Sequence, residues 1–306
     1  MSLSQFTARL DAFASEFEAF LETLFLARPA EGEIARPARL LEAMRYASLA
    51  GGKRLRPFLV AESAKLFSVP REQALMTGAA LECVHCYSLA HDDLPAMDDD
   101  AMRRGRPALH KAFDEATAIL AGDSLLTFAF DLLARPQTHP DSAVRIALVA
   151  ELARAAGLGG MAGGQMLDLA AEGRFGQPAL DESGVVTLQR MKTGALLRFA
   201  GIAGGILGQA DATRRAALSR FGEAFGAAFQ IADDLLDVEG DAATIGKAVG
   251  KDAASGKATL VGLLGVEGAR ERLLQRVGEA HAALAPFGKA GETLRLAADY
   301  AATRKL

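Results

Sequence analysis

Two groups of aspartates stand out in this chain, because carboxylates packed so closely together can bind cations. In the first group, which begins at Asp92 and ends at Asp100, five carboxylates fall within nine positions. The second group contains Asp233, Asp234 and Asp237. Neighbouring carboxylates repel one another unless a positive charge lies among them, and magnesium and calcium bind carboxylate oxygens. Each group therefore predicts either a metal site or a solvated acidic surface.

The surroundings of both groups favour the metal site. The apolar segment 79–90 precedes the first group, so its carboxylates follow a helix that we expect to be buried, and Pro95 must bend or end that helix. Asp233 and Asp237 are four positions apart and share one face of a helix, at the end of an apolar stripe. Gln230 lies one turn before them. Acids in such places need a metal or a basic partner.

Three basic stretches accompany the acids. Residues 51–57 read Gly-Gly-Lys-Arg-Leu-Arg-Pro, and residues 103–107 read Arg-Arg-Gly-Arg-Pro. Cations at the start of a helix are unfavourable in the field of the helix dipole, so we expect the three cations of 51–57 to bind an anion; a solvated basic turn is the alternative. The cations of 103–107 can pair with the neighbouring acids or bind phosphate oxygens. The third stretch is a loop with Lys247, Lys251 and Lys257.

The composition predicts a protein built of helices. Of the 306 residues 50% are hydrophobic, Ala and Leu are abundant, and no strand-like alternation stands out. We expect one all-α domain over residues 1–306, since the two acidic groups make chemical sense only if they face each other. The helices are expected at about 3–27, 37–49, 57–67, 71–91, 114–134, 141–157, 181–192, 194–208, 211–238 and from about 258 onward.

Several other functions are excluded by the sequence. The net charge of −4 gives no basic footprint for nucleic acid. There is no P-loop, which argues against an ordinary nucleoside-triphosphate enzyme. The glycine-rich stretch 157–164 follows no strand, so it does not match the fingerprint of a dinucleotide-binding domain. We interpret those glycines as allowing helices to approach closely. Gln165 and Asp168 share a face of the helix that follows.

The cysteines and the termini bear on the compartment. Cys83 and Cys86 have the spacing of a redox or metal motif, but no second pair and no βαβ pattern accompany them, so we interpret them as small buried residues. The N-terminus shows no charged leader followed by an apolar run, and no uninterrupted apolar stretch reaches the roughly 18 residues of a membrane span. We expect a cytoplasmic protein without a membrane span.

Together, the polar residues predict a diphosphate site. Carboxylates hold magnesium, magnesium holds phosphate oxygens, and Lys and Arg side chains take the remaining charge. No Ser/His/Asp grouping stands out. The chemistry that remains is departure of diphosphate from carbon, in which metal ions stabilise the leaving oxygens and an apolar cavity keeps water from the cation left behind.

With these residues in place, the chain resembles the trans-isoprenyl diphosphate synthases, in particular the bacterial farnesyl diphosphate synthases, over nearly its whole length. The resemblance implies an all-helical bundle with a central cavity and the two aspartate motifs on opposing walls. It rests on five motifs that occur in order: residues 51–57, Asp92 to Gly105, residues 163–168, Lys192-Thr193-Gly194, and Phe229 to Asp237.

The resemblance also implies roles for individual residues. About three Mg²⁺ ions would be bound, by Asp92 and Asp98 on one wall and by Asp233, with Asp237, on the other. The allylic diphosphate would contact Arg103, Lys192 and Lys247. Isopentenyl diphosphate would be held by Lys53, Arg56, His85 and Arg104. The carbocation would be stabilised by Lys192, Thr193 and Gln230, and Gln165 and Asp168 would act toward metal-bound water.

The length of the product is predicted from the helix before the first motif. Tyr87 and Ser88 lie one turn before Asp92, and a ring at Tyr87 should form the floor of the cavity. In the family that the chain resembles, an aromatic residue there together with the insertion Pro95-Ala96 goes with a fifteen-carbon product, farnesyl diphosphate. Geranylgeranyl and geranyl diphosphate synthases remain alternatives, as do a terpene cyclase and a non-catalytic regulatory subunit. A homodimer is expected by resemblance only.

Overall fold

The computed structural model describes residues 2–176, 180–239 and 259–303. The chain divides into two compact units. Unit 1 comprises residues 1–6, 62–69 and 147–306, and unit 2 comprises residues 7–61 and 70–146. Helices α1, α3 and α7 contribute residues to both units. The described chain is all-α apart from one two-stranded ribbon, as the composition predicted.

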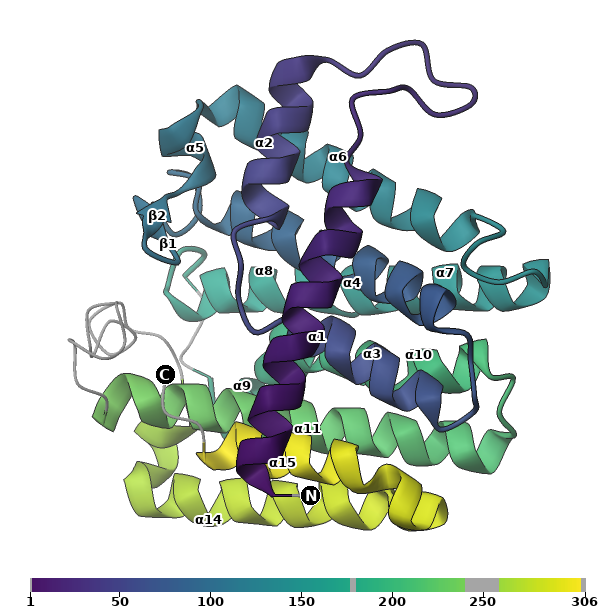
Figure 1. Ribbon diagram of the computed structural model, residues 1–306. Coiled ribbons are helices and arrows are strands. Elements are labelled where there is room, and N and C mark those ends of the chain that lie inside the picture. The colour runs from purple at the N-terminus through teal and green to yellow at the C-terminus, as the bar shows by residue number, and fades with distance from the viewer. Residues whose placement is uncertain (1, 177–179, 240–258, 304–306) are drawn as a thin grey trace. The chain divides into compact units, whose positions relative to one another are not determined.

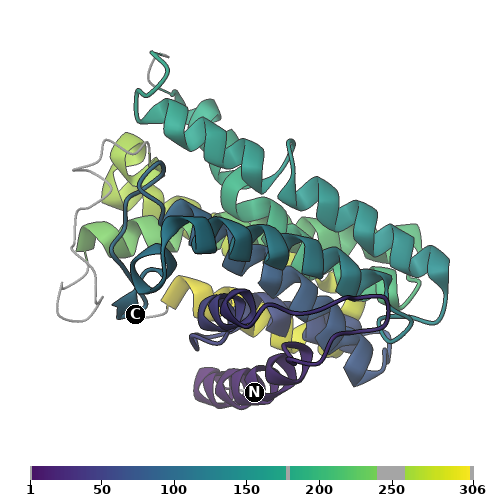
Figure 2. The ribbon, with the colours of Figure 1, turned by 90° about the horizontal axis from the view of Figure 1, so that it is seen from above.

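Unit 2 is organised around a pair of helices, α4 (Arg71–Asp92) and α6 (Glu115–Ala134), which run side by side (Figure 1 and Figure 2). Gly122 allows this close packing, because a Cβ atom there would lie 2.1 Å from Nε2 of His91. The α4 helix ends at Asp92, three residues before Pro95, as expected. The other elements that lie wholly or mostly in unit 2 are α1 (Leu3–Leu24), α2 (Ala38–Ser48), α3 (Leu55–Lys65), α5 (Leu109–Ala112) and the strands β1 (Met102–Arg103) and β2 (Arg106–Pro107).

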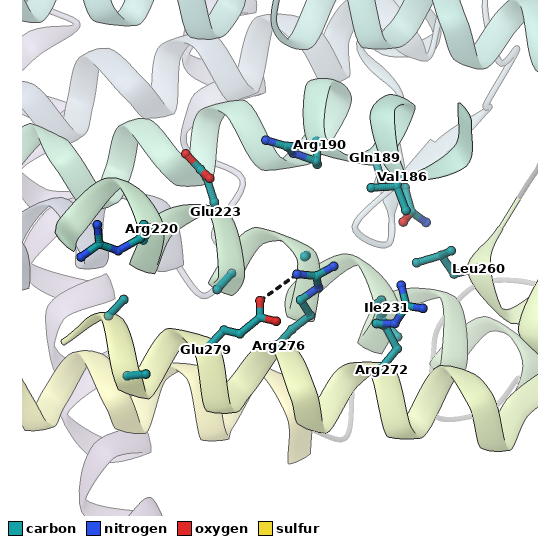
Figure 3. Close-up of a pocket in the computed structure, with 14 residues that line it drawn as sticks. Val186, Gln189, Arg190, Arg220, Glu223, Ile231, Leu260, Arg272, Arg276 and Glu279 are labelled. Atoms are coloured by element: carbon teal, nitrogen blue, oxygen red, sulfur yellow. Dashed lines mark hydrogen bonds and ion pairs between the residues drawn. The ribbon is translucent and has the colours of Figure 1, made fainter. Parts of the chain in front are cut away.

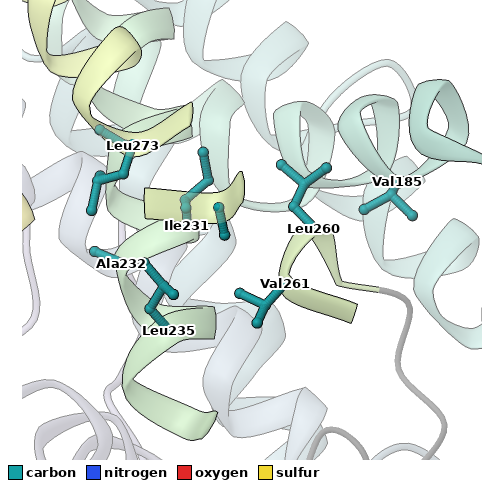
Figure 4. Close-up of a cluster of buried hydrophobic side chains, with 9 residues drawn as sticks. Val185, Ile231, Ala232, Leu235, Leu260, Val261 and Leu273 are labelled. Carbon is teal, nitrogen blue, oxygen red and sulfur yellow. The ribbon is translucent and has the colours of Figure 1, made fainter. Parts of the chain in front are cut away.

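Unit 1 is built on the long helix α11 (Ala212–Glu239), which packs against α10 (Ala195–Leu207), α14 (Leu260–Ala283) and α15 (Glu292–Thr303) (Figure 1). Buried side chains of α11, α14 and α9 form an apolar cluster that holds the aspartate-bearing end of α11 in place (Figure 4). The other elements are α7 (Ser142–Ala156), α8 (Met161–Ala171), α9 (Glu182–Gln189), the π-helix η1 (Arg190–Gly194) and the 3₁₀-helix η2 (Ala285–Gly291).

Two local elements were not predicted. The antiparallel ribbon β1–β2 pairs Arg103 with Arg106, and its two-residue strands are too short to show alternation in sequence. The π-helix η1 lies where the sequence predicts a junction between two helices at residues 192–194. Helix α3 also begins at Leu55, two residues before the expected start at Pro57, so the proline lies within the first turn.

Two stretches, α6 and residues 142–171, are long and apolar enough to pass as membrane-spanning by composition. Core helices of helical proteins have the same composition, and α6 packs against α4 along much of its length. The stretch 142–171 is interrupted between α7 and α8.

Candidate functional site

The loop after α4 folds back on itself and brings two predicted metal ligands together. The backbone N–H of Asp98 donates to the carbonyl of Asp92 over 2.9 Å, and the N–H of Asp99 donates to the carbonyl of Leu94 over 3.1 Å. The carboxylates of Asp92 and Asp98 therefore arise from adjacent points of the backbone, although six positions separate them in sequence. Both side chains are half-buried.

The aspartate next to Asp92 has a different position. Asp93 is 2% exposed, and both its oxygens accept hydrogen bonds from the guanidinium of Arg103. Arg103 also lies 3.6 Å from Asp100. The ribbon β1–β2 carries Arg103 to this carboxylate. Asp93 thus fixes a cation beside the half-buried Asp92, and it does so from within the protein.

The first basic turn meets the second one in unit 2. Gly51 and Gly52 have φ values of +71° and +115°, which side chains rarely adopt. Nη1 of Arg104 donates to the carbonyl of Gly51 over 2.6 Å. A Cβ atom on Gly52 would lie 3.0 Å from the same nitrogen. The two glycines therefore provide both the turn and the surface on which the Arg104 guanidinium lies.

His85 lies among the cations of both turns. Nη1 of Arg56 is 3.5 Å from Nε2 of His85. Burial, and then the charges of Arg56 and Arg104, hold the pKa of His85 well below its usual range. The imidazole is therefore neutral at pH 7. Lys53 is exposed on the same turn, with Nζ 3.8 Å from Asp11.

Arg54 departs from the prediction that all three cations of this turn bind an anion. Arg54 is 4% exposed. Its guanidinium pairs with Glu82 over 2.6 Å and with Glu18 over 2.5 Å. It also donates to the carbonyl of Ser48 over 2.6 Å. A buried arginine needs such partners because an unpaired charge inside the protein is costly. Arg54 therefore anchors the turn from inside the protein.

The two residues predicted to control product length are half-buried on α4. The ring of Tyr87 packs edge-on against His91, with centroids 5.8 Å apart, and burial raises the pKa of its hydroxyl. Ser88 donates to the carbonyl of His85 over 2.9 Å. Tyr87 therefore presents a ring one turn before Asp92, whereas the Ser88 hydroxyl is satisfied by its own helix.

In unit 1 the π-helix η1 presents Lys192 to α8. Nζ of Lys192 is 2.5 Å from Oδ2 of Asp168, which is 6% exposed. The approach depends on Gly164, because a Cβ atom there would lie 2.2 Å from the backbone nitrogen of Lys192. At Gly164 this close contact confirms the interpretation that glycine here serves helix packing. Asp168 is thereby brought to the ammonium group of Lys192.

A chain of hydrogen bonds connects the other predicted catalytic residues of unit 1. Oγ1 of Thr193 donates to Oε1 of Gln230 over 2.6 Å, and Nε2 of Gln230 donates to Asp234 over 2.8 Å. Nε2 of Gln189 donates to the other oxygen of Asp234 over 2.8 Å. A carboxylate only accepts, so Asp234 orients both amide groups toward it. The oxygen of Gln230 is left facing Thr193.

The four predicted metal ligands fit magnesium by their chemistry. Asp233 and Asp237 are half-buried and lie one turn apart on α11. The described residues contain no metal-binding group of three or more His, Cys, Asp or Glu side chains. Magnesium typically takes one or two carboxylates together with water and substrate phosphates, so a pair of aspartates in each unit suits it. Lys247 lies outside the described residues.

The two cysteines are buried and free, as predicted. Burial raises the pKa of both thiols, that of Cys86 to about 12. A thiol with such a pKa is protonated at neutral pH and reacts poorly. The Cys-x-x-Cys spacing therefore marks core residues of α4.

The family follows from comparison with known sequences. The sequence model of the family described as Polyprenyl synthetase matches residues 37–287, which is more than half of the chain. The chain belongs to the polyprenyl synthetase family. The match includes the residues of both aspartate groups, of the two basic turns, and of Lys192 and Thr193.

Relatives of known activity match most of the chain or nearly all of it. The farnesyl diphosphate synthase of Haemophilus influenzae is 42% identical over 99% of this chain and 100% of its own. That of Escherichia coli is 46% identical over 80% of this chain and 81% of its own. The crystal structure of an FPP/GFPP synthase from Zymomonas mobilis superposes with a TM-score of 0.86 at 40% identity, covering 98% of this chain and 99% of that one.

The sequence alone missed the residues that position the site of this polyprenyl synthetase. Asp93 and Asp234 each follow a predicted ligand directly, so they were counted with the acidic groups rather than assigned a role of their own. The spacing of four between Gln230 and Asp234 is a signal that could have found the second one. Gln189 carries no signal, because its partner is 45 positions away.

We predict that Gly164→Ala moves Lys192 in this polyprenyl synthetase. The new methyl group overlaps the backbone of η1, so α8 and η1 must separate and the contact with Asp168 lengthens. The free energy of unfolding should fall by about 1–3 kcal/mol, the typical cost of overpacking, measured by urea denaturation. Gly159→Ala is the control, because a Cβ atom there meets nothing within 4 Å. Equal stability of the two variants would contradict the close packing.

His85 predicts a specific dependence of stability on pH. The pKa of His85 is lowered in the folded protein. Below about pH 6.5 the imidazole is therefore protonated in the unfolded chain while it stays neutral in the folded protein. The contribution of His85 to the free energy of unfolding is therefore largest above that pH. It decreases as the pH falls, by up to about 1.4 kcal/mol per pH unit. The free energy of unfolding of the wild type should decline more steeply between pH 7 and pH 5 than that of His85→Gln. Parallel curves would show that His85 ionises normally.

Proposed function

We propose that this protein is a prenyltransferase that joins isopentenyl diphosphate head to tail with dimethylallyl or geranyl diphosphate, and that its main product is farnesyl diphosphate. The 42% identity to a farnesyl diphosphate synthase over 99% of the chain supports this substrate class. The 46% identity to a second synthase of that name supports it further.

The observation that carries the proposal is the cluster of cations around His85. Arg104 lies on the Gly51–Gly52 turn, and Arg56 lies against the imidazole. Such a cluster can bind a diphosphate by charge-assisted hydrogen bonds without any metal. The carboxylate pairs serve a second, metal-bound diphosphate. Two different diphosphate sites fit a condensation of two substrates, whereas a terpene cyclase handles one.

In the proposed reaction, Lys53, Arg56, His85 and Arg104 hold isopentenyl diphosphate, and Arg103, Lys192 and Lys247 contact the allylic diphosphate. The carbon–oxygen bond of the allylic substrate breaks, and diphosphate leaves with the bonding electrons. The double bond of isopentenyl diphosphate attacks the allylic carbon and forms the new carbon–carbon bond. The resulting cation loses a proton to the released diphosphate, and the new double bond forms. No oxidant or reductant is required.

The residues of unit 1 act on the allylic cation. The oxygens of Thr193 and Gln230 face each other over 2.6 Å, because Asp234 binds the amide nitrogen of Gln230. Oxygen dipoles fixed in advance stabilise a positive charge without having to reorient during the reaction. The ammonium group of Lys192 would bind the leaving oxygens, and its ion pair with Asp168, which limits its orientations, supports this role.

We propose Asp92, Asp98, Asp233 and Asp237 as the residues that hold Mg²⁺, with about three ions in total. When bound, the metal ions supply positive charge that stabilises the leaving diphosphate. We further propose that residues 1–306 act as one domain, that the protein forms a homodimer, and that it works in the cytoplasm. The family relationship supports these assignments.

Product analysis tests the proposed reaction. Purified protein, magnesium and radiolabelled isopentenyl diphosphate are incubated with dimethylallyl, geranyl or farnesyl diphosphate, and the products are separated by chain length. We expect mainly the fifteen-carbon product from the first two starters, and loss of product when EDTA is added. Mainly longer products would indicate a geranylgeranyl diphosphate synthase, and mainly shorter products a geranyl diphosphate synthase. No condensation by folded protein would favour a cyclase or a regulatory subunit.

We predict that Tyr87→Ala lengthens the product. The ring of Tyr87 lies one turn before Asp92 and packs against His91, so its removal opens space behind the allylic chain. Products of twenty or more carbons should become a major fraction in the same assay. Tyr87→Phe keeps the ring and should retain the wild-type product. An unchanged product distribution in Tyr87→Ala would show that another residue forms the floor.

A further inference from the structure

Unit 1 contains a cavity of about 550 Å³ whose lining includes none of the predicted site residues. Side chains of α9, η1, α11 and α14 form its walls (Figure 3). On α11 the lining residues recur at steps of three and four, which makes them one stripe of the helix. The cavity has a size typical of pockets for small molecules.

The lining of this cavity has an apolar part, which we call its floor, and a charged part. Val186, Ala224, Ala227, Ile231 and Leu260 supply apolar surface above the core cluster of unit 1. Four arginines and two glutamates lie around it: Arg190, Arg220, Arg272, Arg276, Glu223 and Glu279. The net charge of these six side chains is therefore +2.

The arginines differ in their partners. Arg276 pairs with Glu279 over 2.7 Å, and Arg272 pairs with Glu182 over 3.0 Å. Neither Arg190 nor Arg220 forms an ion pair with any carboxylate in the part of the chain that the structure describes. Figure 3 shows Arg190 and Arg276 on different walls of the cavity. Two guanidinium groups are thus left to bind an anion from outside.

We propose that this cavity is a second anion-binding site, for a short-chain alkyl or alkenyl phosphate. The apolar floor would take the hydrocarbon chain, and Arg190 and Arg220 would bind the phosphate by charge-assisted hydrogen bonds. The ligand needs both parts. A free phosphate gains nothing from the floor, and a neutral hydrocarbon leaves the arginines without a partner.

Occupation of the cavity has a direct route to the predicted catalytic residues. Gln189 lines the cavity and donates to Asp234, which also accepts from Gln230. A ligand that attracts the Gln189 amide changes the orientation of Asp234 and, through it, the oxygen of Gln230. The site is therefore regulatory, and this part of the inference rests on the proposed prenyl transfer.

Calorimetry tests the site without any catalysis. The wild-type protein is titrated with n-octyl phosphate in the presence of EDTA, so that the aspartates hold no metal. We expect saturable binding, and about tenfold weaker binding for Arg220→Gln, which loses one charged hydrogen bond. Ala282→Trp places a large ring on an exposed lining position and should abolish binding. Inorganic phosphate and n-octanol, which carry only one of the two parts, should bind at least tenfold more weakly.

Two further variants separate this cavity from other cationic surfaces. Arg214→Gln removes an exposed arginine of the same helix outside the cavity and should bind n-octyl phosphate like the wild type. Arg56→Gln weakens any binding of n-octyl phosphate at the cluster around His85 and should leave the affinity of the cavity unchanged. Circular dichroism confirms that each variant is folded. Equal affinities of the wild type and Arg220→Gln, or loss of binding in Arg214→Gln, would overturn the proposed site.

Steady-state kinetics test the connection through Gln189. At saturating substrates with magnesium, n-octyl phosphate should change kcat of the wild type and leave kcat of Ala282→Trp unaffected. Competition at the catalytic site would raise KM and leave kcat unchanged in both proteins. Binding by calorimetry together with an unchanged kcat would overturn the regulatory role. If no prenyl transfer is found at all, the calorimetry still decides whether the site exists.

Discussion

The arrangement of Gln189, Gln230 and Thr193 in unit 1 depends on hydrogen bonds to the carboxylate of Asp234. Asp234 is 4% exposed and accepts hydrogen bonds from the amide groups of Gln189 and Gln230. A buried carboxylate without donors would be costly, so the two amides are held in one orientation. The oxygen of Gln230 then faces Thr193 rather than its own helix. One buried carboxylate thus determines the orientation of two neighbouring amide groups.

Unit 2 uses the same principle with arginines. Asp93 holds Arg103, and Glu18 and Glu82 hold Arg54. Asp93 and Glu82 are buried and Glu18 is half-buried, so these ion pairs fix segments of backbone rather than adding much surface charge. The segments fixed in this way are the ribbon that carries Arg103 and the turn that carries Lys53 and Arg56. Buried ion pairs therefore position the backbone segments that carry Arg103, Lys53 and Arg56.

The sequence predicted the helices and the grouping of charges, but not the role of each charge. Long apolar segments, and the prolines that bound some of them, placed α4, α6 and α11 within one or two residues. Spacing alone could not separate Asp92 from Asp93, since neighbours on a helix end point in different directions and only the fold decides which is buried. The ribbon β1–β2 has two residues in each strand, too few for a pattern. Arg54 was misassigned because its partners lie 36 and 28 positions away.

Because η1 is a π-helix, the number of residues between α9 and α10 determines how these two helices are oriented to each other. A π-turn accommodates one residue more than an α-turn, and each residue of an α-helix advances by about 100°. Removal of a single residue from Arg190–Gly194 would therefore convert α9, η1 and α10 into one uninterrupted α-helix. Everything before the deletion would rotate by about 100° relative to α10, and Gln189 would turn away from Asp234. The register between these helices thus tolerates substitutions of side chains but no change in the number of residues.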